Sequence, residues 1–183
     1  TDYKVKEVEL SFEGLPESFD GYRIAFISDI HIGSMWNPES ELEKLSSVVN
    51  STGADVILFG GDLVNLHHSE LSQPILDRLS LIKARHGVFA VMGNHDTGSY
   101  VKGSTKEFRA ENMASLARSV SFIGWTYLRD STIYINNGTH SIAITGIDYS
   151  EKLQEYKHSF KAIDNFNVSH IYENVPDSVF NIT

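Results

Sequence analysis

The sequence contains no cysteine, and this absence excludes several kinds of chemistry. A chain without Cys forms no disulfide bond and has no thiolate for nucleophilic catalysis or for metal binding. Any metal ion must therefore be bound by His, Asp, Asn or water. The compartment stays open, since a protein without Cys can work anywhere.

Long apolar runs are also absent. No run approaches the roughly 18 to 20 residues that are needed to span a bilayer, and the first residues, TDYKVKEVEL, lack the charged-then-apolar pattern of a signal peptide. We therefore expect a soluble domain that is cytoplasmic or is anchored to a membrane through a segment outside this sequence. The sequence begins within a predicted strand and without an initiator Met, so we also expect a processed or trimmed protein.

Positive charge is scarce, with 15 basic residues against 24 acidic ones and a net charge of -9. This balance argues against a surface for nucleic acid or anionic membrane, which would need a broad positive field. With 41% hydrophobic and 21% charged residues, the 183-residue chain has the composition of a globular protein. We expect a single domain over residues 1–183 with one core and no linker.

Short apolar runs alternate with helical patterns in the first two thirds of the chain. Buried strands are predicted within YRIAFISD (22–29), DVILFGGD (55–62) and GVFAVMGNHD (87–96), and helices within 37–53, 73–85 and from 104 onward. Such alternation with apolar strands favours a parallel sheet built from βαβ units and covered by helices. The expected class is therefore α/β.

Local signals sharpen several of these boundaries. Asn37 is a plausible N-cap with Pro38 at the first helical position, and Gly53 marks the helix end. Ser104 and Glu107 have the spacing of a capping box for the third helix.

Elements of a different kind flank this alternating region. Residues 3–12 alternate polar and apolar side chains like a half-buried strand, and residues 132–148 read as a hairpin about Asn137-Gly138, which adds antiparallel strands. A helix over 150–163 and a short strand over 165–170 complete the prediction.

Three of the predicted buried strands end on polar residues of one chemical type. These residues are Asp29 and His31, then Asp62, then Asn94, His95 and Asp96. In an open α/β sheet, ligands bind outside the carboxyl ends of the strands. The three strand ends are therefore expected to share one pocket.

The types and spacing of these residues suit divalent cations. Asp29 and His31 lie two apart, so on a continuing strand they would share a face and bind one ion together, although such a pair is also common as a hydrogen-bonded loop. Asp62 can bridge two ions with its two oxygens, and Asn94 can offer a carbonyl oxygen to the second. This mixture of imidazole and oxygen donors suits Mn, Fe or Zn better than Ca.

The ordered set Asp29-x-His31, Gly61-Asp62 and Gly93-Asn94-His95-Asp96 resembles the motifs of the calcineurin-like metallophosphoesterases. The resemblance covers the chain from about Tyr22, and the motif forms look most like those of bacterial phosphodiesterases of the membrane or cell envelope, including enzymes that cleave nucleotide-linked lipid precursors. It implies a sandwich of two mixed β-sheets flanked by helices, with a centre of two divalent metal ions at one edge.

The resemblance also implies a role for each matching residue. Asp29, His31 and Asp62 would bind the first ion, and Asp62 with Asn94 the second. His95 would face the phosphate as a general acid, with Asp96 orienting it. A further His of the family corresponds to His170, with Asn174 as the alternative alignment.

One departure concerns the last part of the family pattern. Such enzymes complete both ions with a Gly-His-x-His segment on a later strand, and no such segment precedes Thr183. We therefore expect a chain that is truncated at its C-terminus and lacks the last strands of the fold. The missing strands would expose sheet edges for self-association.

Two classes of function follow from these observations. The first is a metal-dependent phosphoesterase, more specifically a phosphodiesterase, in which a hydroxide bridging two metal ions attacks the phosphorus of a phosphate-ester substrate. The alternative is a non-catalytic binding or scaffold module on the same fold, or an inactive fragment. His67 and His68 follow Asp62 closely, but a structural role is the more common explanation for such residues.

Overall fold

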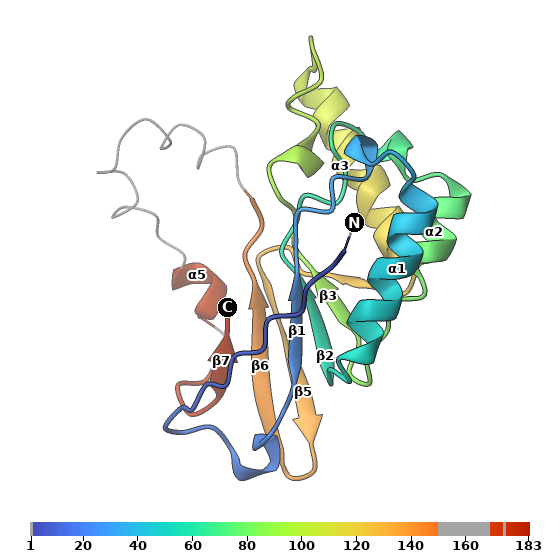
Figure 1. Cartoon of the computed structure of the whole chain (residues 1–183). Coiled ribbons are helices and arrows are strands. Elements are labelled where there is room, and N and C mark those ends of the chain that lie inside the picture. The colour runs from blue at the N-terminus through green and yellow to red at the C-terminus, as the bar shows by residue number, and fades with distance from the viewer. Residues whose placement is uncertain (1, 150–168, 174) are drawn as a thin grey trace. The chain divides into compact units, whose positions relative to one another are not determined.

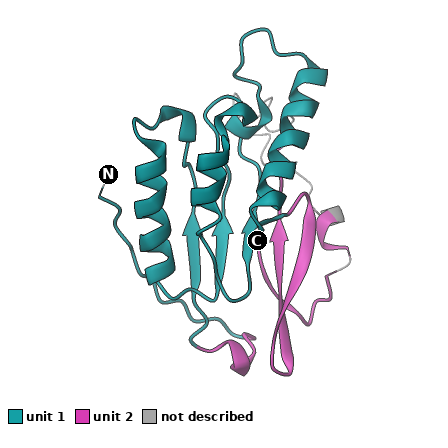
Figure 2. Ribbon diagram, turned by 90° about the vertical axis from the view of Figure 1, so that its right-hand side faces the viewer, with its two compact units in different colours: residues 1–13, 21–127 teal, residues 14–20, 128–183 magenta. Residues whose placement is uncertain are grey.

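The computed structural model describes residues 2–149, 169–173 and 175–183, and the chain falls into two compact units (Figure 2). Unit 1 comprises residues 1–13 and 21–127, and unit 2 comprises residues 14–20 and 128–183. All the predicted site residues except His170 lie in unit 1. A single domain over the whole chain stays a prediction.

Unit 1 is built around a parallel sheet of four strands in the order β1-β2-β3-β4. The strands are β1 (Ile24–Ile27), β2 (Val56–Phe59), β3 (Val88–Ala90) and β4 (Thr126–Tyr127). The three predicted strands and their parallel pairing are confirmed. The predicted burial is wrong for β1, because Ile24 and Phe26 are 41% and 68% exposed. The two-residue strand β4 carries too short a pattern to be predicted, and it pairs with β3.

Three helices lie on one face of this sheet (Figure 1). They are α1 (Pro38–Ser51), α2 (Gln73–Leu79) and α3 (Lys106–Phe122). Their apolar side chains form one core with the strands, in which Leu42, Leu79 and Leu116 are almost completely buried. Single 3-10 turns occur at η1 (Glu17–Phe19), η2 (Ile32–Ser34), η3 (His68–Glu70) and η4 (His95–Thr97).

The helix ends agree with the local signals in part. Asn37 caps α1 by accepting a hydrogen bond from the Ser40 amide, and Gly53 ends it with a φ of 63°. The capping-box prediction for α3 is wrong by one residue, because the Thr105 hydroxyl accepts from the Phe108 amide and acts as the N-cap.

Helix α2 ends at Leu79, earlier than the predicted 85. The side chain of Asn50 on α1 donates to the Leu81 carbonyl and accepts from the Lys83 amide, at 2.8 Å and 3.1 Å. Because of these bonds, the backbone after Leu79 has hydrogen-bond partners without being helical. A tertiary contact therefore overrides the helical pattern of the sequence.

The predicted strand over residues 3–12 is wrong, since this segment has no regular secondary structure. Val8 and Leu10 are 64% and 66% exposed. Polar and apolar alternation stabilises a strand only when a neighbouring strand completes its hydrogen bonds.

Unit 2 contains a mixed sheet in the order β5-β6-β7. Its strands are β5 (Ser131–Asn137), β6 (His140–Gly146) and β7 (Phe180–Ile182), and it also contains the short helix α5 (Ser169–Tyr172). Strands β5 and β6 form the predicted hairpin, but Asn137 pairs with His140, so Gly138 and Thr139 form its tip. Strand β7 runs parallel to β6. The α/β class is confirmed. Of the two sheets that the resemblance implies to be mixed, the first is parallel over its described strands and the second is mixed.

The remaining predictions concern the segment before α5. The helix over 150–163 and residues 165–168 of the predicted strand lie outside the described residues. The last two residues of that strand, Ser169 and His170, belong to α5 instead. No helix in the described ranges is long and apolar enough to cross a membrane.

Candidate active site

The predicted site residues of unit 1 lie in the loops that follow β1, β2 and β3, at the carboxyl edge of the parallel sheet (Figure 1). Backbone hydrogen bonds hold the first two loops side by side beyond the ends of the strands. The Asp29 amide donates to the Gly61 carbonyl and the His31 amide to the Asp62 carbonyl, both at 3.0 Å. The side chains of the two loops therefore lie close together.

Three of these residues have left-handed backbone conformations that few residues other than glycine adopt. The φ angles of Asp29, His31 and Asp62 are 55°, 46° and 60°. Strand β1 ends at Ile27, so Asp29 and His31 do not share a strand face as expected, and the turns of the loop bring them together instead. Such conformations cost about 1 to 3 kcal/mol each and concentrate at functional sites.

His31 lies between two carboxylates. Its Nε2 atom is 3.6 Å from Oδ1 of Asp29 and 3.7 Å from Oδ2 of Asp62. The Nδ1 atom is buried and has no hydrogen-bond partner among the described residues. One ligand atom from each of His31, Asp62 and His95 lies within 4.8 Å of the others. This arrangement of imidazole and carboxylate donors fits a divalent cation.

Asp62 is held in place by its neighbours. Its Oδ1 atom accepts from the His95 amide at 2.8 Å, while Oδ2 faces His31. Gly93 packs so closely that a Cβ atom there would overlap Asp62 Oδ1 and lie 2.5 Å from the Asp62 nitrogen. Glycine at position 93 is therefore required by close approach.

The ring of His95 is fixed on several sides. Its Nδ1 atom lies 2.7 Å from the Asn65 carbonyl, and because a carbonyl only accepts, Nδ1 carries a proton. The ring stacks on Tyr100 with centroids 4.4 Å apart and meets the His31 ring edge-on at 4.6 Å. The Nε2 atom is thus the one that remains for proton transfer or a ligand.

Asp96 does not orient His95 through a bond to its ring, because the ring partner is Asn65. Instead, Asp96 Oδ2 accepts from the amides of Asp62 and Gly93, and Oδ1 accepts from the Val64 amide. Burial of the carboxyl raises its pKa to about 6, and these hydrogen bonds oppose the shift. Asp96 thus ties the loop after β2 to the turn after β3.

Asn94 is oriented by Tyr100. Its Nδ2 atom donates to the Tyr100 hydroxyl at 2.9 Å, which leaves the Oδ1 atom of the amide for a cation. The following 3-10 turn, η4, is closed by the Thr97 hydroxyl, which donates to the Asn94 carbonyl. The amide therefore presents the carbonyl oxygen that the sequence prediction requires.

Comparison with known families agrees with this site. The model of the calcineurin-like phosphoesterase family matches residues 22–176. The chain belongs to the calcineurin-like phosphoesterase family. The match includes every predicted site residue.

Curated relatives share the family but are much longer than this chain. A transmembrane protein with a metallophosphoesterase domain from Danio rerio is 39% identical over 51% of this chain and 21% of its own length. UDP-2,3-diacylglucosamine pyrophosphatases from Chlamydia muridarum and Chlamydia trachomatis are 37% and 32% identical over 48% and 60% of this chain, and 27% and 35% of their own lengths. The matches thus span about a fifth to a third of these relatives.

Solved structures show weaker similarity. Phosphopantetheinyl hydrolase from Mycobacterium tuberculosis gives a TM-score of 0.47 at 18% identity, covering 79% of this chain and 54% of that one. An archaeal phosphodiesterase gives 0.39 at 16% identity, covering 73% and 64%. These similarities are too weak to carry an argument.

Several residues that this phosphoesterase site uses were missed by sequence reasoning. They are Asn65, Glu70, Tyr100 and Asn112. Buried Asn112 on α3 donates to the Asp96 carbonyl and accepts from the His68 amide, both at 2.8 Å. Its signal was a polar residue four positions before buried Leu116 in an apolar stripe. Asn65 and Glu70 act through or on backbone groups, and Tyr100 contacts the side chains of Asn94 and His95. None of the three leaves a comparable pattern.

Four other positions were considered from the sequence, namely His67, His68, His170 and Asn174. His170 is the second residue of α5 in unit 2, and Asn174 lies outside the described residues. The rings of His67 and His68 are 4.2 Å apart, and His67 stacks on Phe108 at 5.2 Å. These contacts favour a structural role for the pair.

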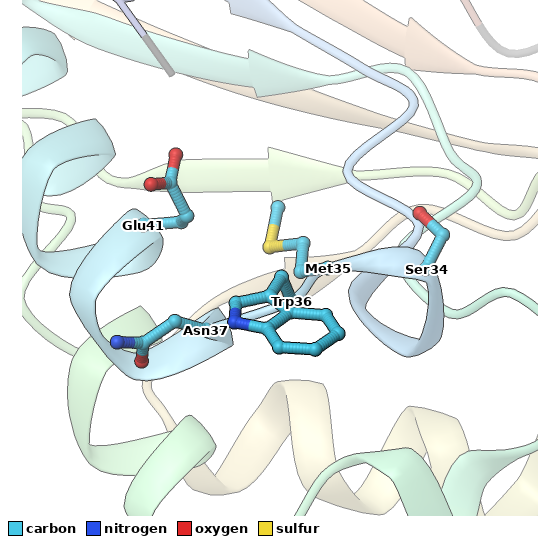
Figure 3. Close-up of a pocket in the computed structure, with 5 residues that line it drawn as sticks. All are labelled: Ser34, Met35, Trp36, Asn37 and Glu41. Atoms are coloured by element: carbon cyan, nitrogen blue, oxygen red, sulfur yellow. The ribbon is translucent and has the colours of Figure 1, made fainter.

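The loop after His31 also forms a pocket (Figure 3). It has a volume of about 450 Å³ and is lined by Ser34, Met35, Trp36, Asn37 and Glu41. Trp36 is fully exposed.

Proposed function

We propose that the protein is a metal-dependent phosphoesterase that hydrolyses phosphodiesters at this site. The observation that supports the proposal most strongly is the convergence of donor atoms from His31, Asp62 and His95 within 4.8 Å at the carboxyl edge of the sheet. Family membership supports the same reaction class.

The proposed ligands are those of the sequence prediction. Asp29, His31 and Asp62 would hold one divalent cation, Asp62 and Asn94 a second, and His170 would add a further ligand. Mn, Fe or Zn suits these donors. When bound, a pair of such cations acidifies water for attack on phosphorus and offsets the charge of the phosphate.

The residues of the chain supply positioning and the proton. The Asn65 carbonyl keeps a proton on Nδ1 of His95, so a second proton on Nε2 makes the ring a donor to the leaving oxygen. The Tyr100 ring stacks on the His95 ring, and the Tyr100 hydroxyl accepts a hydrogen bond from the side-chain amide of Asn94. Asp96 holds the backbone of both loops and takes no part in proton transfer.

The substrate class follows from the relatives as a proposal. Two of them are named as pyrophosphatases of a nucleotide-linked diacylglucosamine, and another as a transmembrane protein. We propose that this protein also cleaves a phosphodiester or pyrophosphate linkage and works at a membrane or envelope.

Replacing Asp62 with Asn tests the proposed function. The Asp62→Asn variant of the full protein keeps the size of the side chain but loses the charge that binds the cations, so turnover of an aryl phosphodiester with added Mn²⁺ should fall to the uncatalysed background. Asp77→Asn, at an exposed acid on α2, is the matched control and should keep full turnover. Undiminished turnover by Asp62→Asn would contradict the metal proposal.

A further inference from the structure

The carboxylate of Glu70 accepts four backbone hydrogen bonds from two loops of the site. Its Oε2 atom accepts from the amides of Gly33 at 2.9 Å and Asn65 at 2.7 Å. Its Oε1 atom accepts from the amides of Leu66 at 2.7 Å and His67 at 3.1 Å. Gly33 belongs to the loop after β1 and the others to the loop after β2, so this single side chain joins the two loops.

These bonds use both oxygens of Glu70 fully. A carboxylate oxygen has two lone pairs, and each oxygen here accepts two N–H groups. Glu70 therefore has no acceptor left for a cation or a substrate. It acts on the site through the backbone it binds.

One of these backbone groups connects Glu70 to His95. The peptide group between Asn65 and Leu66 donates its N–H to Glu70 and accepts the Nδ1 proton of His95 at its C=O, each at 2.7 Å. In a trans peptide the N–H and C=O groups point in opposite directions, so one peptide bridges the carboxylate and the imidazole. Hydrogen bonds in such a chain polarise and strengthen one another.

We propose that Glu70 is a positioning residue for His95, acting through the Asn65–Leu66 peptide. The charge of Glu70 orients this peptide and strengthens its carbonyl as an acceptor. The Nδ1 proton is then fixed, and Nε2 faces the reacting phosphate. The consequence for catalysis rests on the proposed function, whereas the effect on the ring does not.

The tautomer of His95 is the direct test. Imidazole ¹⁵N chemical shifts of the neutral ring distinguish a proton on Nδ1 from one on Nε2. In the wild-type chain we expect His95 to be protonated on Nδ1, with the resonances assigned by their loss in His95→Gln. In Glu70→Gln, one acceptor oxygen is replaced by an NH₂ group, which cannot accept hydrogen bonds from the amides. The Asn65–Leu66 peptide is then held less firmly, so His95 should become a mixture of both tautomers.

Two further variants make the result specific. Glu43→Gln removes the charge of an exposed acid on α1 and should leave the tautomer unchanged. Glu70→Asp keeps the charge on a shorter side chain and should give a smaller shift, and it replaces Glu70→Gln if that variant does not fold. A folded Glu70→Gln chain with the wild-type tautomer would overturn the proposal.

Turnover gives a second readout. In the full protein, Glu70→Gln should lower kcat about tenfold to a hundredfold with little change in KM, the size of effect typical of a misplaced catalytic group. In a His95→Gln background the same change should cost nothing more, because the two residues act as one unit. If the losses in kcat caused by Glu70→Gln and His95→Gln were additive, the proposed link between Glu70 and His95 would be wrong. If no variant hydrolyses a phosphodiester, the proposed function fails and the tautomer result still decides the role of Glu70.

Discussion

Asp29, His31 and Asp62 all have left-handed backbone conformations. Among the described residues, Asp130 is the only other residue besides glycine with such a positive φ. Strain of this kind persists when surrounding bonds enforce it, and here the amides of Asp29 and His31 are bound by the neighbouring loop. The site thus uses backbone geometry that a sequence pattern does not record.

Asp96 gives a prediction for the pH dependence of stability. Burial raises the pKa of its carboxyl from 3.8 to about 6, so the folded protein holds this proton more tightly than the unfolded chain. Its stabilising contribution is full below about pH 4 and is lost as the pH rises through about 6. The free energy of unfolding of metal-free protein should therefore fall by up to roughly 3 kcal/mol over this range.

Urea unfolding of wild type and Asp96→Asn across this range measures the effect. The variant cannot ionise at position 96, so its stability should depend less on pH than that of wild type. Equal slopes in the two proteins would show that Asp96 does not titrate in this way.

At the residue scale, some site residues are easier to predict from the sequence than others. Residues whose side chains would take part in the chemistry are predicted better than residues that bind through or to backbone groups. Asp62 and His95 stand at strand ends in recognisable motifs, and the structure brings them together. Asn65 contributes a carbonyl, which every residue type possesses, so no pattern could mark it. Glu70 binds amides across two loops, and that pairing depends on the fold.

At the element scale, two carboxylates connect the three loops of the site. Glu70 joins the loops after β1 and β2, and Asp96 joins the loops after β2 and β3. The strands hold the ends of these loops, and the carboxylates fix the loops themselves. A small shift of one loop is therefore expected to displace the predicted site residues of the next loop.

Gly93→Ala tests this close fit. A Cβ atom at this position would overlap Asp62 Oδ1, so the turn after β3 must move away from the loop after β2. We expect turnover of an aryl phosphodiester to fall by about a hundredfold, as for other misplaced catalytic groups. Gly103→Ala is the control. The φ of Gly103 is 77°, so Ala is strained at this position, but a Cβ atom there would meet no atom within 4 Å. Wild-type turnover by Gly93→Ala would show that the fit is not needed.

Helices and strands were predictable where the residues within them determine where they begin and end. Strands β1 to β3 are apolar and helix-covered, and α1 has its own cap and stop. The end of α2 was missed because Asn50, on another helix, binds the backbone after Leu79. The strand over residues 3–12 was predicted wrongly because alternation cannot report whether a partner strand exists.

At the scale of the whole molecule, the excess of acids is consistent with cation binding rather than with a nucleic-acid surface. Family membership and the geometry of unit 1 both point to phosphoester hydrolysis. Self-association through sheet edges and the contribution of His170 stay predictions.

The number of metal ions that the protein binds tests the central claim most directly. Metal-free full-length protein is titrated with Mn²⁺ while bound metal and turnover of an aryl phosphodiester are followed together. The account predicts two ions per chain, with turnover appearing only as they bind, because both ions are needed to activate water and to offset phosphate charge. Wild-type turnover by the metal-free protein, or full turnover with one ion bound, would contradict it.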